Sequence, residues 1–137
     1  MAGQALFGVP RARPPLACWL AIVACWLLLA SPGLASDKAS IKQNVDDVVK
    51  AIDNGRPATS FAADAFVPYV FVMEPSGRLL VHPYLVGEYL QEKAAPVHAA
   101  LQQATTDGLW VSYFWKGTEK ETYVRRTQTN LTVGSGQ

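Results

Sequence analysis

Cysteine is almost absent from this sequence. Its 137 residues contain two, Cys18 and Cys25, and both lie in one apolar stretch near the N-terminus. The remainder of the chain offers His82 and His98 as candidate soft metal ligands, and neither has a Cys, Asp or Glu at metal-ligand spacing. We therefore expect no disulfide framework, no thiol chemistry, no metal and no cofactor, and a domain held together by its apolar core.

An excess of charge of one sign is also missing. The chain has 12 basic and 11 acidic side chains. Proteins that bind nucleic acids carry a strong basic excess, because they must neutralise phosphates. The composition therefore indicates that nucleic acid is not a partner.

The familiar catalytic motifs are missing as well. No G-x-S-x-G elbow, H-E-x-x-H helix, Walker loop or dinucleotide fingerprint occurs. The segment Gly134-Ser135-Gly136 has no His or Asp placed to activate its serine. The sequence therefore predicts a protein that is not an enzyme.

The N-terminal segment has the pattern of a secretory signal peptide. Arg11 and Arg13 precede the apolar run LACWLAIVACWLLLA at 16–30, and small residues lead to Ala35. The run is shorter than the ~20 residues that span a bilayer, so an uncleaved membrane anchor is the less favoured alternative. We expect residues 1–35 to be a signal peptide cleaved near Ala35, and the mature protein to be periplasmic or secreted.

Residues 36–137 have the length of a single domain. Apolar residues recur at helical period from Ile41 to Ile52, which predicts a long amphipathic helix over 37–54. The pattern predicts a second helix at 95–104 and strands at 65–73, 78–82, 109–115, 120–128 and 131–135. This order predicts an α+β domain with an antiparallel sheet.

The stretch GLWVSYFWKGTEKETYVRR at 108–126 mixes aromatic and cationic side chains. With a four-residue loop in the first hairpin, Tyr69 lies opposite His82. With a five-residue loop in the second, Tyr113 lies opposite Tyr123, and Arg125 joins the same face. The interpretation as a ligand pocket and the interpretation as ordinary core are evenly matched at this stage, because aromatic residues dominate cores as well.

Several segments in this order resemble the single Cache domain of bacterial extracytoplasmic sensors. The sequence departs from the family pattern at Asn130-Leu131, where a tryptophan is usual. The matching segments are Gly77-Arg78, His82-Pro83, Gly87, GLWVSYFW at 108–115, KETYV at 120–124 and VGSG at 133–136.

The resemblance implies a PAS-like antiparallel sheet with the long N-terminal helix packed on one face and a ligand pocket on the other. It implies a small organic ligand, with a short carboxylate favoured, because Arg and Lys side chains match carboxylates. Output would pass to a membrane receptor or a histidine kinase. The expected ligand-binding residues are Tyr69, His82, Tyr113, Trp115, Lys120, Tyr123 and Arg125. A protein-interaction module without a small ligand is the alternative.

The signal-peptide assignment predicts where the mature chain begins. Expressed in a bacterium, the protein should be recovered from the periplasm with its N-terminus at or near Ser36, as measured by mass spectrometry. Recovery of the intact N-terminal segment in the membrane fraction would support the anchor instead.

Overall fold

A long helix leads into a sheet whose strands are not paired in chain order. The computed structural model describes residues 33–137, and the predicted signal peptide lies outside them but for its last three residues. The elements are α2 (Gly33–Asp53), the short 3-10 helices η1 (Ala58–Ser60) and η2 (Ala63–Ala65), β1 (Val70–Met73), β2 (Leu79–Val81), α3 (Leu90–Lys93), α4 (Ala95–Leu101), β3 (Leu109–Trp115), β4 (Thr118–Arg126) and β5 (Thr132–Gly136).

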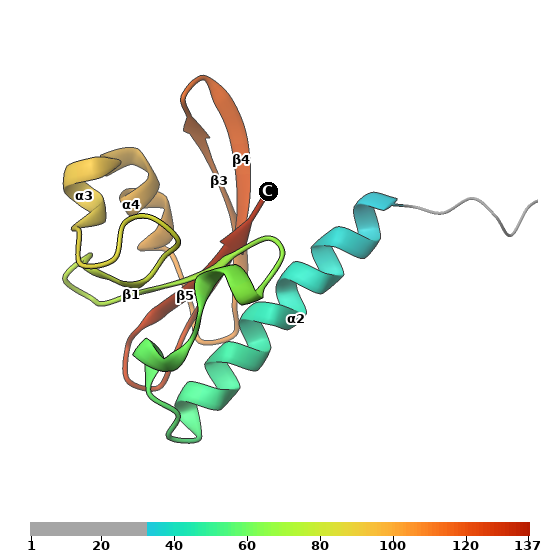
Figure 1. Cartoon of the computed structure of the whole chain (residues 1–137). Helices are drawn as coiled ribbons and strands as arrows, with labels where there is room; N and C mark the ends of the chain where they lie inside the picture. The colour runs from blue at the N-terminus through green and yellow to red at the C-terminus, as the bar shows by residue number, and fades with distance from the viewer. Residues whose placement is uncertain (1–32) are drawn as a thin grey trace, which may run out of the picture. The chain divides into compact units, whose positions relative to one another are not determined.

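The five strands form one antiparallel sheet in the order β2-β1-β5-β4-β3. The last strand, β5, therefore lies in the middle, between the two hairpins β1–β2 and β3–β4 (Figure 1). The α+β class and the antiparallel sheet are confirmed. Within the described residues, no helix has the length and apolarity that crossing a membrane requires.

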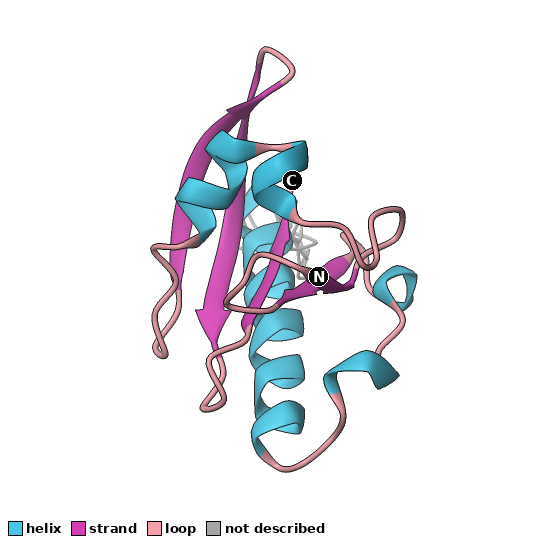
Figure 2. Cartoon of the chain, turned by 90° about the vertical axis from the view of Figure 1, so that its left-hand side faces the viewer, coloured by secondary structure: helices cyan, strands magenta, loops and turns pink. Residues whose placement is uncertain are grey.

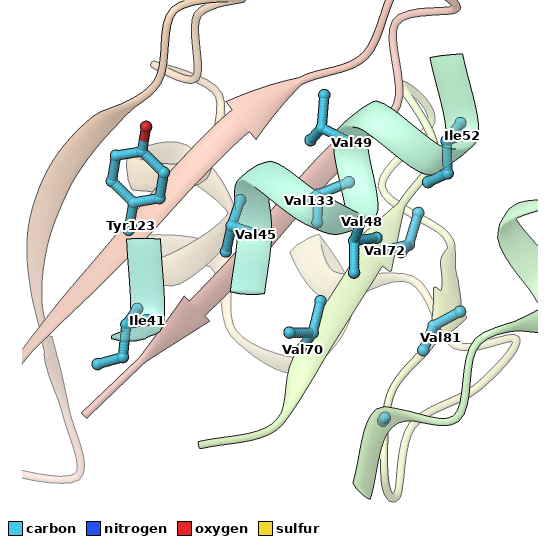
Figure 3. Packing of buried hydrophobic residues seen from close by; sticks show 11 residues of the cluster. Ile41, Val45, Val48, Val49, Ile52, Val70, Val72, Val81, Tyr123 and Val133 are labelled. Carbon is cyan, nitrogen blue, oxygen red and sulfur yellow. The ribbon is translucent and has the colours of Figure 1, made fainter. Parts of the chain in front are cut away.

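One face of the sheet is covered by α2. The predicted stripe is confirmed, since Ile41, Val45, Val48, Val49 and Ile52 are all buried. Figure 3 shows this stripe over the side chains that β1 and β5 direct toward the helix. The helix begins before the expected Asp37, in a segment whose Leu and Ala favour helix.

The opposite face is partly covered by α3 and α4. Leu90 on α3 and Val97 and Leu101 on α4 share a second apolar cluster with Phe71 and Val124 from the sheet. Figures 1 and 2 show the α3–α4 pair and α2 on opposite sides of the sheet. The domain thus has three layers, and each face of the sheet has its own apolar cluster.

The first hairpin differs from its prediction. Strand β1 begins at Val70 rather than residue 65, because Pro68 has no N–H to give to a strand ladder. The pairs are Val72 with Val81 and Met73 with Leu79, with a bulge between them. The expected register, with Tyr69 directly opposite His82, is therefore wrong.

The second hairpin differs more seriously. Lys116 and Gly117 form a two-residue turn, and both have positive φ, as a type I′ turn requires. The turn places Tyr113 opposite Lys120 and Trp110 opposite Tyr123. The expected pairing of Tyr113 with Tyr123 is wrong by three residues, and an odd shift moves side chains to the other face of the sheet.

The middle strand presents glycine to the face opposite α2. Phe71 on β1 pairs with Gly134, and its ring occupies the space where a side chain at Gly134 would lie. The space beside Gly136 is similarly filled by the Thr122 hydroxyl and the backbone of β4. Side chains from β1 and β4 therefore occupy the places that side chains of β5 would otherwise take on this face.

Because the Phe71 ring lies so close to Gly134, one methyl group added at this position should lower the stability of the domain markedly. Gly134→Ala should destabilise the domain by about 1–3 kcal/mol, because the new Cβ overlaps the Phe71 ring. The measurement is urea unfolding followed by circular dichroism.

The matched control is the same substitution in a Phe71→Leu background, which lacks the ring atoms that the Cβ would meet. There the added cost of Gly134→Ala should be much smaller. An equal cost in both backgrounds would contradict the proposed overlap.

Candidate functional site

A cavity of about 600 Å³ opens on the face of the sheet opposite α2. Its floor includes Phe71, Thr122 and Gly136, and Leu90 and Val97 come from the helices above. Phe71 and Thr122 occupy the places beside Gly134 and Gly136 on β5, and both side chains line the cavity. The glycines of the middle strand therefore let side chains of β1 and β4 form the floor.

Three rings form one side of this cavity. Tyr69 precedes β1, and its ring meets the His82 ring edge to face with centroids 5.2 Å apart. The Tyr84 ring also contacts the His82 ring edge to face, with centroids 6.2 Å apart. Burial raises the pKa of Tyr69, and the nearby phenols of Tyr113 and Tyr84 raise it further. Tyr69, Tyr84 and Tyr113 all contribute phenol groups to the cavity lining.

His82 is held in one tautomer by the loop that follows it. Its Nδ1 accepts hydrogen bonds from the backbone N–H groups of Tyr84 and Leu85, each at 3.1 Å. The proton of the neutral ring therefore lies on Nε2. Burial lowers the pKa of His82, which favours this neutral form. No group of three His, Cys, Asp or Glu side chains that could hold a metal occurs in the described part of the chain.

The other side of the cavity is built by the β3–β4 hairpin. Tyr113 and Trp115 project from β3 into the lining, and Lys120 on β4 lies directly opposite Tyr113. The Tyr113 hydroxyl and the Thr122 Oγ1 are hydrogen-bonded at 2.8 Å. Lys120 is partly buried, and among residues 37–137 no acceptor forms a hydrogen bond or ion pair with its ammonium group.

Two further lysines line the cavity. Lys93, at the end of α3, forms a 3.5 Å ion pair with Glu88. Lys116 lies at the hairpin turn, 5.6 Å from the centroid of the Trp115 ring. The lining within the described residues contains no Asp or Glu side chain. The cavity is thus rich in cations and hydrogen-bond donors.

Two of the seven expected site residues lie elsewhere. Tyr123 and Arg125 face α2. Arg125 Nη1 donates a hydrogen bond to Asp46 Oδ1 on this helix at 3.1 Å. Arg125 Nε donates to the carbonyl of Thr106, in the loop before β3, at 2.6 Å. Lys42 also donates to Asp46, at 2.6 Å. Burial acts to raise the pKa of Asp46, but the hydrogen bonds from Lys42 and Arg125 outweigh it and hold that pKa below its ordinary value.

The expectation that Arg125 lies on the same face of the sheet as Tyr113 is therefore wrong, while its role in ligand binding stays a prediction. Arg125 instead ties β4 to α2, and Tyr123 is buried under the helix. The other five expected residues, Tyr69, His82, Tyr113, Trp115 and Lys120, all line the cavity. Their role in ligand binding stays a prediction.

Sequence reasoning did not assign the other lining residues to the site, among them Tyr84, Lys93, Lys116 and Thr122. The correct hairpin register would have found Thr122. That register places Lys120 opposite Tyr113, and Thr122, two residues further along β4, lies on the same face. Tyr84 and Lys93 lie in a segment whose sequence shows no clear period.

Comparison with protein-family models gives no match for this sequence, and comparison with curated proteins gives none. The likeness to the Cache domain therefore rests on the sequence segments alone.

The environment of His82 predicts a pH effect on stability. A folded-state pKa below that of the unfolded chain means that the unfolded state binds the proton more readily. The contribution of His82 is present above its unfolded pKa and is lost as the pH falls. The free energy of unfolding should therefore decrease between pH 7.5 and 5, as measured by urea unfolding.

His82→Asn is the matched control, since an Asn oxygen can accept the same two backbone N–H groups without titrating. The decrease should be smaller in this variant. Identical pH profiles would show that His82 does not titrate differently in the folded state.

Proposed function

We propose that this domain is a sensor that binds a small organic carboxylate in the cavity between its two hairpins. The observation that carries the proposal is Lys120, a partly buried lysine beside Tyr113 whose ammonium group has no counter-ion among residues 37–137. A partly buried charge is costly unless it is paired, and an anionic ligand would supply the pair.

The rest of the lining suits the same ligand. The His82 Nε2–H and the phenol hydroxyls of Tyr69 and Tyr84 are donors that can reach oxygen acceptors in the cavity. The rings supply apolar walls, and Lys120 supplies a charge-assisted hydrogen bond. Lys93 and Lys116 add positive charge at the margins.

The proposal extends to an extracytoplasmic PAS-like domain of the Cache type. It is supported by α2 on one face of the antiparallel sheet and a cavity on the other, as the sequence resemblance implies. With export by the predicted signal peptide, the domain would sense ligand outside the cytoplasm. It would pass the signal to a membrane receptor or a histidine kinase, and the ligand would leave unchanged.

A protein-interaction module is the second candidate. Phe114 on β3 faces away from the cavity and is 69% exposed, and exposed aromatic side chains are enriched in interfaces. A domain of this kind would show no response to small anions.

Ligand binding predicts a rise in melting temperature. At a ligand concentration of about 100 times Kd, binding to the folded state should stabilise it by ~2.7 kcal/mol. For a domain of this size that is a shift of roughly 4–8 °C. The measurement is fluorimetry with a panel of organic carboxylates, amines and neutral molecules.

Lys120→Gln should weaken carboxylate binding about 10- to 100-fold, the value of one hydrogen bond to a charged group. It should not destabilise the domain, since Lys120 has no hydrogen-bond or ion-pair partner among residues 37–137 to lose. Lys50→Gln, on the exposed side of α2, is the control of equal charge and should bind normally. No response to any carboxylate would favour the interaction module, and equal binding by both variants would remove Lys120 from the site.

A further inference from the structure

The cavity is much larger than a short carboxylate requires. If each non-hydrogen atom takes about the ~30 Å³ of a water molecule in the liquid, the five of propanoate fill only about 150 Å³. The cavity holds about 600 Å³. A short carboxylate at Lys120 would therefore leave most of the aromatic lining in contact with water.

Four tyrosine and tryptophan side chains line the cavity within the described residues. Tyr69 and Tyr84 lie on the side of β1 and β2, and Tyr113 and Trp115 lie on the side of β3. Between them lie Gly136 on the middle strand, which has no side chain of its own, and the small side chain of Thr122. Aromatic groups attract one another through stacked and edge-to-face contacts beyond the burial of apolar area. An aromatic ring is the ligand group that suits such a space.

The charges exclude one common class of carboxylate. An α-amino acid brings an ammonium group next to its carboxylate, and a carboxylate side chain is the strongest partner for that group. The lining within the described residues has three lysines and no Asp or Glu side chain. An ammonium group near Lys120 would be desolvated beside a like charge, which disfavours binding.

We propose that the cavity selects a carboxylate that carries an aromatic ring and no ammonium group, with the carboxylate at Lys120 and the ring between Tyr69 and Trp115. This inference rests on the proposed function and replaces the short carboxylate expected from the sequence. It names a ligand class, aryl-substituted monocarboxylates, which the family resemblance does not imply.

Three ligands separate the two parts of this inference. Propanoate and 3-phenylpropanoate differ in the ring alone, while 3-phenylpropanoate and L-phenylalanine differ in the ammonium group alone. The affinity of the purified protein for each is measured by isothermal titration calorimetry. We expect 3-phenylpropanoate to bind at least 10-fold more tightly than propanoate and at least 10-fold more tightly than L-phenylalanine.

Two variants locate the ring. Trp115→Ala removes a ring that lines the cavity at the end of β3 and is 38% exposed, so its loss should not unfold the domain. It should reduce the preference for 3-phenylpropanoate over propanoate several-fold. Phe114→Ala, the neighbouring residue on the opposite face of β3, is the matched control and should leave the preference unchanged.

The outcomes distinguish this inference from the proposed function. Propanoate binding as tightly as 3-phenylpropanoate would overturn the aromatic selectivity and leave a carboxylate sensor intact. Equal binding of L-phenylalanine would overturn the exclusion of ammonium groups. An unchanged preference in Trp115→Ala would also overturn the proposal. If none of the three ligands binds at millimolar concentration, both the inference and the proposed function fail.

Discussion

Two positions on β5 have no room for a side chain on the face opposite α2, because atoms of neighbouring strands already occupy it. The Phe71 ring lies against Gly134, and Thr122 lies against Gly136. Interiors are packed densely enough that even one added methyl group would displace a neighbour. The close approach lets Phe71 and Thr122 lie against the backbone of β5, where both form part of the cavity floor. The core on one face and the cavity above it thus depend on the same two residues.

Strand β4 carries cationic side chains on both faces of the sheet. Arg125 points toward α2, where Asp46 neutralises it, and Lys120 points toward the cavity, where no side chain among residues 37–137 does so. Alternation along a strand makes this separation unavoidable for residues at odd spacing. One strand thereby carries both a cation that fastens a helix to the sheet and a cation left for a ligand.

The parts of this structure that sequence predicted best are those fixed by local pattern. The apolar residues of α2 recur with the period of a helix, which predicted this element. Strand β3 spans the residues 109–115 that the sequence predicted. The errors came from turns, because Lys116-Gly117 is a tighter connection than the loop that its sequence suggested. Because the turn sets the strand register, the wrong loop length placed Tyr123 and Arg125 on the face of Tyr113 in the prediction, whereas they lie on the opposite face. His82 and Tyr69 nevertheless came together, through contacts between rings rather than through strand pairing.

The two tryptophans of β3 lie on opposite faces of the sheet, so their intrinsic fluorescence can report on both faces of the domain. Trp110 packs on Tyr123 under α2, with Lys38 Nζ 4.9 Å from its ring centroid, whereas Trp115 lines the cavity. The other two tryptophans of the sequence lie in the predicted signal peptide. Intrinsic emission from the mature protein therefore has two sources, one sensitive to the seating of the helix and the other to the polarity of the cavity. Single-tryptophan forms would let each face be followed separately in time.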